Sequence, residues 1–437
     1  MDTNTCSHWY RRNLDAEGSC PPGAANFVAI RSIAIPTDGE PPLHPRRDQP
    51  MFIPRVSYGQ QRLVSLLAAH GARCSVASLY FTQANPELAL MPSAAGLGLV
   101  LDPSTHLRER PPAERAPSFR AHRWGDGPDA FDPDRSSISE SELEELSIGP
   151  LELQRGRGAT LMLTSYQVPG PCGTRGRDLE LMCARAGIAH FRSERMDEPP
   201  EHAAVATRRE IYATLAARIE DLLSPRVRHS LADAYLGLGA DGVWVKLLGF
   251  HEAADRQCQR AGGAFLRELA DGPIPVVSDG AGQLHLGLLT CGVSASIGIG
   301  DSERFRYPTP WKQATQDSRS KGRTRFAYHA SFMRSFKLGS DTARRAFALS
   351  RCRCGEHPPA QAPTNAQVGE HAAVVRMRDA ATAADGTTAD RREWLLALAT
   401  KSTWLEGDAD LRPGNMLEAL RALYAGWDER PESFAVG

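Results

Sequence analysis

The sequence lacks the features that would export it or place it in a membrane. Its first residues, MDTNTCSHWYRRNLDAEG, contain no apolar core of a signal peptide. No run of about 18 uninterrupted apolar residues occurs, and such a run is what a membrane-spanning helix needs. The longest apolar stretch, residues 284–300, is interrupted by His285 and by several glycines and serines. We therefore expect a cytoplasmic protein with no membrane partner.

A strong charge of either sign is also missing. The 51 Lys and Arg residues nearly balance the 52 Asp and Glu residues, so the formal net charge is −1. The chain as a whole therefore does not call for a polyanionic partner. A disulfide framework is absent too, because the nine cysteines are odd in number and scattered. Without an export signal they are expected to be reduced thiols.

Composition divides the 437 residues into three parts. Residues 1–50 are rich in proline, glycine and arginine and have few periodic apolar positions, which predicts a loosely ordered arm. Residues 51–305 are predicted to form the main domain, interrupted at 109–150 by a polar insertion with one short acidic helix. Residues 306–437 begin with a basic block and end in helices.

Short apolar segments alternate with helical segments between residues 95 and 305, which predicts a parallel sheet covered on both faces. The predicted strands are 96–101, 160–166, 188–191, 242–250, 274–278 and 293–299. The predicted helices are 60–70, 177–186, 208–223, 231–238, 253–270, 284–290, 390–404 and 415–427. An open doubly wound sheet gives the same pattern, but the length of the series and the polar residues after strands favour a (β/α)8 TIM-like barrel.

Three aspartates directly follow predicted strands. Asp102 follows GLGLVL, Asp279 ends IPVVSD, and Asp301 follows SASIGIG. A barrel brings such strand ends to one mouth, where a carboxylate can act as nucleophile, as base or as a ligand to a polar substrate. A structural role remains open for each, because Asp is common in turns and helix caps, and Asp102-Pro103-Ser104 is typical turn sequence.

Glycines gather around the last predicted strand. Gly298 and Gly300 could present backbone N–H groups to a phosphate of the substrate. Their spacing fits neither the dinucleotide-binding pattern nor the P-loop pattern. Tight turns and close packing are the favoured explanation of the same glycines.

A basic block spans residues 306–353. Its twelve Lys and Arg residues, among them Arg323 and Arg325, are opposed only by Asp317 and Asp341 and are interleaved with aromatic residues. Arg and Lys can neutralise phosphates and aromatic rings can stack on unpaired bases, so the block is a candidate nucleic-acid contact. The alternative is a solvated surface face, which the near-neutral whole chain allows.

Cysteine and histidine are concentrated just after this block, at Cys352, Cys354, His357 and His371. Thiolate and imidazole ligands at short spacing, with one distant His, are typical of a tetrahedral structural zinc ion. The basic surroundings also favour the thiolate form of the cysteines. Two ordinary cysteines beside surface histidines remain the alternative.

With these residues identified, residues 95–375 resemble the tRNA-guanine transglycosylase superfamily, including its branch that modifies DNA with 7-deazaguanines. The resemblance implies a (β/α)8 barrel with a late zinc-binding insertion, CxCxxC plus a distant His, in which His357 would replace the third cysteine. It also implies that Asp301 is the nucleophile, with Lys321-Gly322-Arg323 downstream, and that Asp102 bonds the base edge. The glycine of the family's Asp-Ser-Gly motif is absent here, since Pro103 and Ser104 follow Asp102.

The sequence therefore predicts a transglycosylase-like enzyme that exchanges or removes a nucleobase in tRNA or DNA. Two alternatives remain open. One is a nucleic-acid-binding protein on a barrel scaffold without turnover, and the other is a barrel that binds a small phosphorylated ligand. Fold alone does not choose among them.

Overall fold

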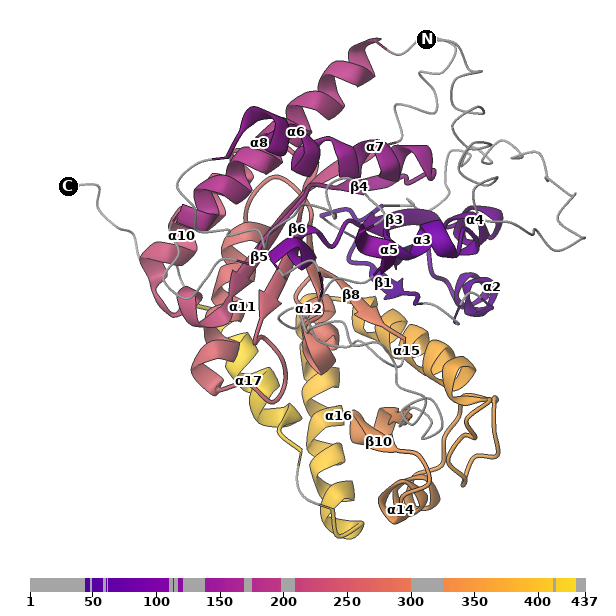
Figure 1. The fold of residues 1–437 in the computed structure, drawn as a ribbon. Helices are drawn as coiled ribbons and strands as arrows, with labels where there is room; N and C mark the ends of the chain where they lie inside the picture. Colours follow the sequence, from indigo (N-terminus) through magenta and orange to yellow (C-terminus); the bar gives the residue numbers. More distant parts are fainter. Residues whose placement is uncertain are drawn as a thin grey trace, which may run out of the picture. The chain divides into compact units, whose positions relative to one another are not determined.

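Figure 1 presents the computed structural model. The residues it describes lie within one compact unit, residues 41–437. They are 44–47, 49–57, 60, 62–109, 113, 117–120, 138–168, 175–197, 209–299, 325–411 and 414–429. Three predicted site residues, Asp301, Gly300 and Arg323, lie outside these ranges. Within the ranges, no helix is both long and apolar enough to cross a lipid bilayer.

Eight parallel strands close into a barrel in chain order, with the first strand pairing with the last. They are β1 (Phe52–Arg55), β2 (Cys74–Ser78), β3 (Gly98–Asp102), β4 (Leu161–Leu163), β5 (Glu210–Arg218), β6 (Gly242–Leu248), β7 (Val276–Asp279) and β8 (Ser294–Gly298). The prediction of a (β/α)8 TIM-like barrel is confirmed.

Helices connect the strands and surround the barrel (Figure 1). They are α2 (Leu63–Ala69), α3 (Phe81–Ala84), α4 (Glu87–Ala94), α5 (Pro117–Arg120), α6 (Glu140–Ser147), α7 (Gly149–Gly156), α8 (Arg175–Asp197), α10 (Pro225–Leu236), α11 (Arg256–Ala270), α12 (His285–Thr290), α14 (Asp341–Leu349), α15 (Val368–Ala384), α16 (Thr388–Asp408) and α17 (Met416–Trp427). Short 3-10 turns are η1 (Thr105–Glu109), η4 (Ile219–Leu223), η5 (Gly282–Leu284) and η6 (Ala330–Phe332). The acidic helix predicted in the insertion is α6, which begins at a capping box formed by Ser139 and Glu142.

The barrel interior is a packed apolar layer below a polar mouth. Its apolar cluster consists of Ile53, Cys74, Val76, Val100, Leu161, Leu163, Tyr212, Trp244 and Val277. Strand alternation sends every second side chain inward, so β6 contributes Gly242, then Trp244, then Lys246 nearest the mouth. Gly242 leaves room for the ring of Tyr212, because a Cβ at this glycine would lie 2.4 Å from a ring carbon. The space inside is therefore filled below the carboxyl ends of the strands.

The helix predicted at residues 208–223 is wrong, because this segment forms β5 and the turn η4. Ile211, Ala213 and Leu215 join the core outside the barrel wall, while Tyr212 and Thr214 are buried on the other face. A parallel strand buried on both faces shows no alternation, and its apolar run then matches a helical period by chance.

The strand predicted at 188–191 is also wrong, because α8 continues through it. Ala184, Ile188 and Phe191 are all buried and follow helical spacing. Gly187 does not end the helix. A Cβ there would lie 3.0 Å from a Leu151 methyl carbon, so the glycine permits close packing of α8 against the α6–α7 pair.

Other predicted strands and helices are of the observed type but differ in length from those of the structure. The predicted strand 160–166 is paired only as β4, although residues 164–168 are buried beyond it. The strands β1 and β2 were not predicted, since Pro54 interrupts the first and small residues dominate the second. The helix α15 was not predicted either.

After β8 the chain forms the hairpin of β9 (Phe326–His329) and β10 (Arg334–Lys337), then α14, before α15 returns to the barrel. The helix α15 packs against β1, α2 and α12, so it completes the ring of helices next to the point where the barrel closes. The last helix, α17, lies along α11, as Figure 1 shows. The proposed division into domains at residues 50 and 305 remains a prediction.

Candidate active site and metal centre

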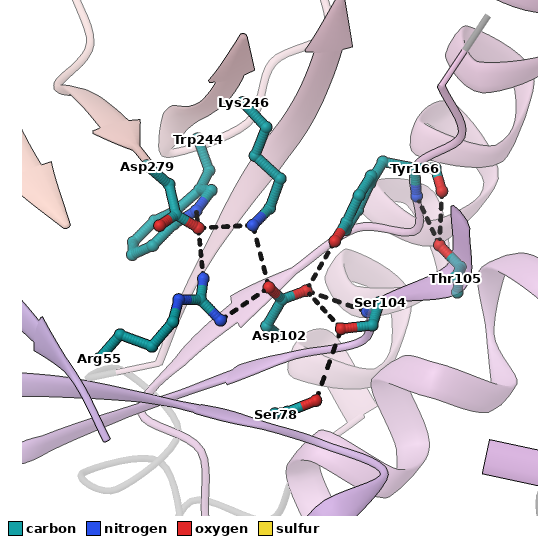
Figure 2. A network of polar contacts seen from close by, with 9 residues as sticks. All are labelled: Arg55, Ser78, Asp102, Ser104, Thr105, Tyr166, Trp244, Lys246 and Asp279. Atoms are coloured by element: carbon teal, nitrogen blue, oxygen red, sulfur yellow. Dashed lines mark hydrogen bonds and ion pairs between the residues drawn. The ribbon is translucent and has the colours of Figure 1, made fainter. Parts of the chain in front are cut away.

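Four charged side chains meet at the mouth of the barrel. Lys246 Nζ lies 2.9 Å from Asp102 Oδ2 and 2.5 Å from Asp279 Oδ2. Arg55 Nη1 lies 3.0 Å from Asp102 Oδ2, and its Nη2 bonds Asp279 Oδ2. Figure 2 shows the two cations between the two carboxylates. Only 3% of the Lys246 side chain, 4% of Asp102 and 3% of Asp279 is exposed. Two positive and two negative charges therefore balance in a site with little water.

Asp102, the last residue of β3, is fully occupied as an acceptor. Its Oδ1 accepts from Tyr166 Oη at 3.0 Å, from the Ser104 backbone N–H at 2.9 Å and from Ser104 Oγ at 3.3 Å. Its Oδ2 accepts from Lys246 and Arg55. A carboxylate with about four lone-pair positions has little capacity left for a substrate. Asp102 thus anchors the cations of the mouth in this arrangement.

Asp279, the last residue of β7, is only half occupied. Its Oδ2 accepts from Lys246, from Arg55 and from Trp244 Nε1 at 3.0 Å. Its Oδ1 has no hydrogen-bond partner among the described residues. Of the two aspartates, Asp279 is therefore the one that retains an oxygen for a ligand.

Electrostatics keep both carboxylates ionised. Burial alone would raise the pKa of Asp102, but Lys246 and Arg55 more than offset it and hold that pKa well below its usual range. The pKa of Asp279 is likewise lowered, because Arg55 and Lys246 outweigh the effect of burial. Burial, together with the Asp102 charge, raises the pKa of Tyr166. Tyr166 therefore stays protonated and donates to Asp102.

The loops after β3 and β4 hold Tyr166 in place. Thr105 Oγ1 donates to the Tyr166 carbonyl at 2.7 Å and accepts from the Tyr166 N–H at 2.8 Å (Figure 2). The His106 ring stacks on the Tyr166 ring with centroids 5.0 Å apart. Burial lowers the pKa of His106 to about 3, so the imidazole is neutral. Ser104 adopts a left-handed backbone, φ 50°, which directs its N–H toward Asp102.

A second cluster, well separated in sequence from the mouth, joins the predicted metal ligands. Ligand atoms of Cys352, Cys354, His357 and His371 all lie within 4.8 Å of one another. His371 Nδ1 is 3.0 Å from His357 Nε2, 3.4 Å from Cys354 Sγ and 3.7 Å from Cys352 Sγ. The cluster could hold a metal ion, and two thiolates with two imidazoles suit zinc by ligand type.

The hydrogen bonds of the two imidazoles test whether a cation fits. His371 Nε2 faces the Tyr328 carbonyl oxygen at 2.5 Å, and His357 Nδ1 faces the Pro358 carbonyl oxygen at 3.0 Å. A carbonyl only accepts, so each of these nitrogens carries the proton. In the neutral rings, His371 Nδ1 and His357 Nε2 then direct lone pairs at each other across 3.0 Å. A bound cation relieves this repulsion, and carbonyl-oriented imidazoles are a common feature of metal sites.

A chain of contacts joins this cluster to the loop after β7. The Arg376 guanidinium lies 3.6 Å from the centroid of the Tyr328 ring. The backbone carbonyl oxygen of Tyr328 in turn bonds His371 Nε2. Arg376 Nη1 donates to Gln283 Oε1 at 2.6 Å, four residues beyond Asp279. Arg376 is 1% exposed, so the link runs through the protein interior.

The other predicted residues that the structure describes lie outside the two clusters. Gly298 ends β8, which pairs with β1 at Arg55, so it lies at the rim of the mouth. Arg325 donates to the Asn365 carbonyl at 2.6 Å. Arg334 and Arg344 pair with Glu406 and Asp341. These partners favour the solvated-face interpretation for this part of the basic block.

Sequence reasoning missed Arg55, Lys246 and Tyr166. Arg55 ends β1 and Tyr166 follows β4, which is the signal that identified the aspartates, whereas Lys246 lies inside β6. Arg55 was missed because β1 was not predicted. Lys246 stands inside the apolar run GVWVKLLGF, where an inward-facing charge needs a buried partner, and that signal was available.

Fold and site together define a closed (β/α)8-barrel protein with a charge-balanced polar mouth and a Cys/His cluster that could hold a metal ion. Comparison with known proteins finds no family model and no curated protein that matches this chain.

Proposed function

We propose that the protein is a transglycosylase-like enzyme that exchanges or removes a nucleobase in a nucleic acid. The observation that carries the proposal is the pair of ionised carboxylates, Asp102 and Asp279, held by Lys246 and Arg55 at the barrel mouth. Departure of a base leaves positive charge on the sugar carbon. A carboxylate can stabilise that charge or attack the carbon to give a covalent intermediate.

The proposal divides the roles among three aspartates. Asp301 remains the proposed nucleophile, three residues after the end of β8, the strand that pairs with both β7 and β1. Asp279 offers its unpartnered Oδ1 to the base edge, a role that the resemblance assigned to Asp102. Asp102 fixes the positions of Lys246 and Arg55, because its own oxygens are occupied.

The Cys/His cluster supports the same proposal by its place in the chain. Three of its residues lie between β8 and α15, and His371 follows in α15, which is where the resemblance expects a zinc-binding insertion and its distant His. The proposed ion is zinc, held by Cys352, Cys354, His357 and His371 in a structural role. With four protein ligands the ion has no open position for a substrate, so it takes no part in the chemistry.

The test combines base exchange with covalent trapping. Purified protein is incubated with tRNA or duplex DNA and labelled guanine or a labelled 7-deazaguanine, and denaturing gels are used to detect an adduct. Wild type is expected to incorporate or release a base and to give an adduct. Asp301→Asn should abolish both while leaving the protein folded and able to bind nucleic acid. Asp279→Asn should abolish turnover.

Asp233→Asn serves as the control, because the Asp233 side chain on α10 is 66% exposed and pairs with His229, outside these contacts and outside the basic block. Nucleic-acid binding with neither turnover nor adduct would replace the proposal by the non-catalytic binding protein. If neither tRNA nor DNA binds at low salt, the nucleic-acid substrate is ruled out.

A further inference from the structure

The opposite end of the barrel carries a cavity that the proposed chemistry does not use. Its volume is about 550 Å³, within the usual range for small-molecule sites. Its walls come from Arg46, Arg47 and Pro50, the end of α11, the starts of β7 and β8, the start of α16 and the end of α17. Because β7 and β8 begin here, the cavity lies at the amino ends of the strands, away from Asp279.

Positive charge dominates the lining. Among the described residues, five guanidinium groups line the cavity against two carboxylates, Asp271 and Asp428. Three of the guanidiniums have a carboxylate partner: Arg267 bonds Asp271 at 2.7 Å, Arg392 bonds Asp428 at 2.8 and 3.1 Å, and Arg46 bonds Glu210 at 3.0 Å. The lining therefore has an excess of cations.

Arg47 and Arg391 provide that excess. Arg47 Nη2 reaches only the Asp271 carbonyl oxygen, at 3.4 Å, and Arg391 Nε reaches only the Asp385 carbonyl oxygen, at 3.2 Å. Neither forms an ion pair within the described part of the chain. Backbone carbonyls carry no net charge, so within the described residues these two positive charges beside the cavity have no carboxylate partner.

Arg392 makes the wall rigid. Besides its two bonds to Asp428, its guanidinium lies 4.9 Å from the centroid of the Tyr424 ring, and its side chain is 18% exposed. Ile274, Pro275 and Trp427 add apolar surface to the same cavity. Fixed cations beside apolar surface can hold a charged group together with a small organic part.

We infer that this cavity binds a small multiply charged phosphate compound of the diphosphate class. Guanidinium groups match phosphate oxygens in two-pronged hydrogen bonds, and two uncompensated charges need a ligand that carries at least two. The inference stands apart from the proposed base exchange. A ligand bound here would act from the amino-terminal face of the barrel and would not touch the reacting atoms.

The test is calorimetric titration of the full chain with inorganic pyrophosphate, with inorganic phosphate and with a short single-stranded oligonucleotide. Pyrophosphate should bind more tightly than phosphate at the same ionic strength. Arg47→Gln and Arg391→Gln should each weaken pyrophosphate binding by about tenfold or more, since each removes a charge-assisted contact. Both side chains are on the protein surface or half-buried, so folding should persist.

Arg421→Gln is the matched control, an α17 arginine that is 61% exposed and paired with Glu418 outside the cavity lining. It should bind pyrophosphate like wild type. Equal affinity in the two cavity variants and wild type, or no pyrophosphate binding at all, would overturn the inference. So would an oligonucleotide that binds more tightly than pyrophosphate and is displaced by it, because the cavity would then be part of a nucleic-acid track.

Discussion

Lys246 bonds Asp102 and Asp279 with one ammonium group, at 2.9 and 2.5 Å, and so ties β3 to β7 across the barrel mouth. Arg55 repeats the connection from β1. A buried cation that holds two carboxylates is a demanding arrangement, because loss of one partner leaves the other charges uncompensated. Its stability and its pH dependence can therefore be predicted.

Replacing the ammonium group tests this arrangement directly. Lys246→Met should lower the free energy of unfolding at pH 7 by about 3–5 kcal/mol, the usual cost of breaking a buried ion pair. The pKa values of Asp102 and Asp279 are lowered in the folded protein, so their stabilising effect is present above the unfolded pKa of about 4 and is lost as pH falls. Urea unfolding of both proteins at pH 7 and at about pH 3.5 measures the free energy of unfolding at each pH.

The difference between wild type and Lys246→Met should shrink at the lower pH, because Asp102 and Asp279 of the variant have lost one cation and take up protons at a higher pH than in the wild type. Lys401→Met, an exposed lysine on α16, is the control and should change little. An equal loss at both pH values would mean that packing, and not charge, is what Lys246 contributes.

The Cys/His cluster predicts metal content. Metal analysis of purified protein should find about one zinc per chain. Cys354→Ser should lower both the zinc content and the thermal midpoint, by several degrees, because metal-binding energy here is folding energy. Cys258→Ser on α11 is the control, since this half-buried thiol lies outside the cluster. A zinc-free preparation that unfolds at the wild-type temperature would contradict the prediction.

The basic block can be tested with arginines that differ in pairing. Arg351 and Arg353 are exposed, and their side chains have no partner within the described residues, whereas Arg344 pairs with Asp341. If the block contacts phosphates, alanine at Arg351 or Arg353 should reduce the slope of log affinity against log salt by about one unit. Arg344→Ala should alter the slope less. Filter-binding titrations at several salt concentrations measure it, and an unchanged slope would leave the block as a solvated face.

Asp379 predicts a pH effect of the opposite sign. Burial raises its pKa to about 6, although Arg376 and the Tyr328 hydroxyl oppose the shift. Asp379 holds its proton more tightly in the folded protein than in the unfolded chain. The protein therefore loses stability as pH rises from the unfolded pKa of this group, near 4, toward 6. Asp379→Asn has no such loss and can still accept from Tyr328 Oη, 3.2 Å away in the wild type.

Between pH 4 and pH 7, the free energy of unfolding of the variant should therefore rise relative to that of the wild type by on the order of 1–3 kcal/mol. Urea unfolding of both proteins at each pH gives the difference, and contributions common to both cancel. A difference that does not vary with pH would show that folding does not raise the pKa of Asp379.

The alternation of strands and helices predicted a parallel sheet, and the length of the series together with the polar residues after the strands favoured the closed barrel. It failed at β5, where both faces are buried and the two periodicities cannot be separated. Asp102, Asp279 and the Cys/His cluster were found from residue type and position. The pairing of the two aspartates through Lys246 and Arg55 could not be found, since strand register and side-chain direction are properties of the closed sheet.

The pairing of β1 with β8 has a consequence for how this barrel could change in evolution. The segment between β8 and α15 leaves the barrel wall beside Arg55 and re-enters it against β1 and α2. Both ends of the segment are thus held by the same corner of the barrel. The described part of its interior holds the hairpin, α14 and three of the four cluster residues, and it contributes no strand to the barrel. An insertion or deletion within it would therefore leave the eight barrel strands and their order of pairing as they are.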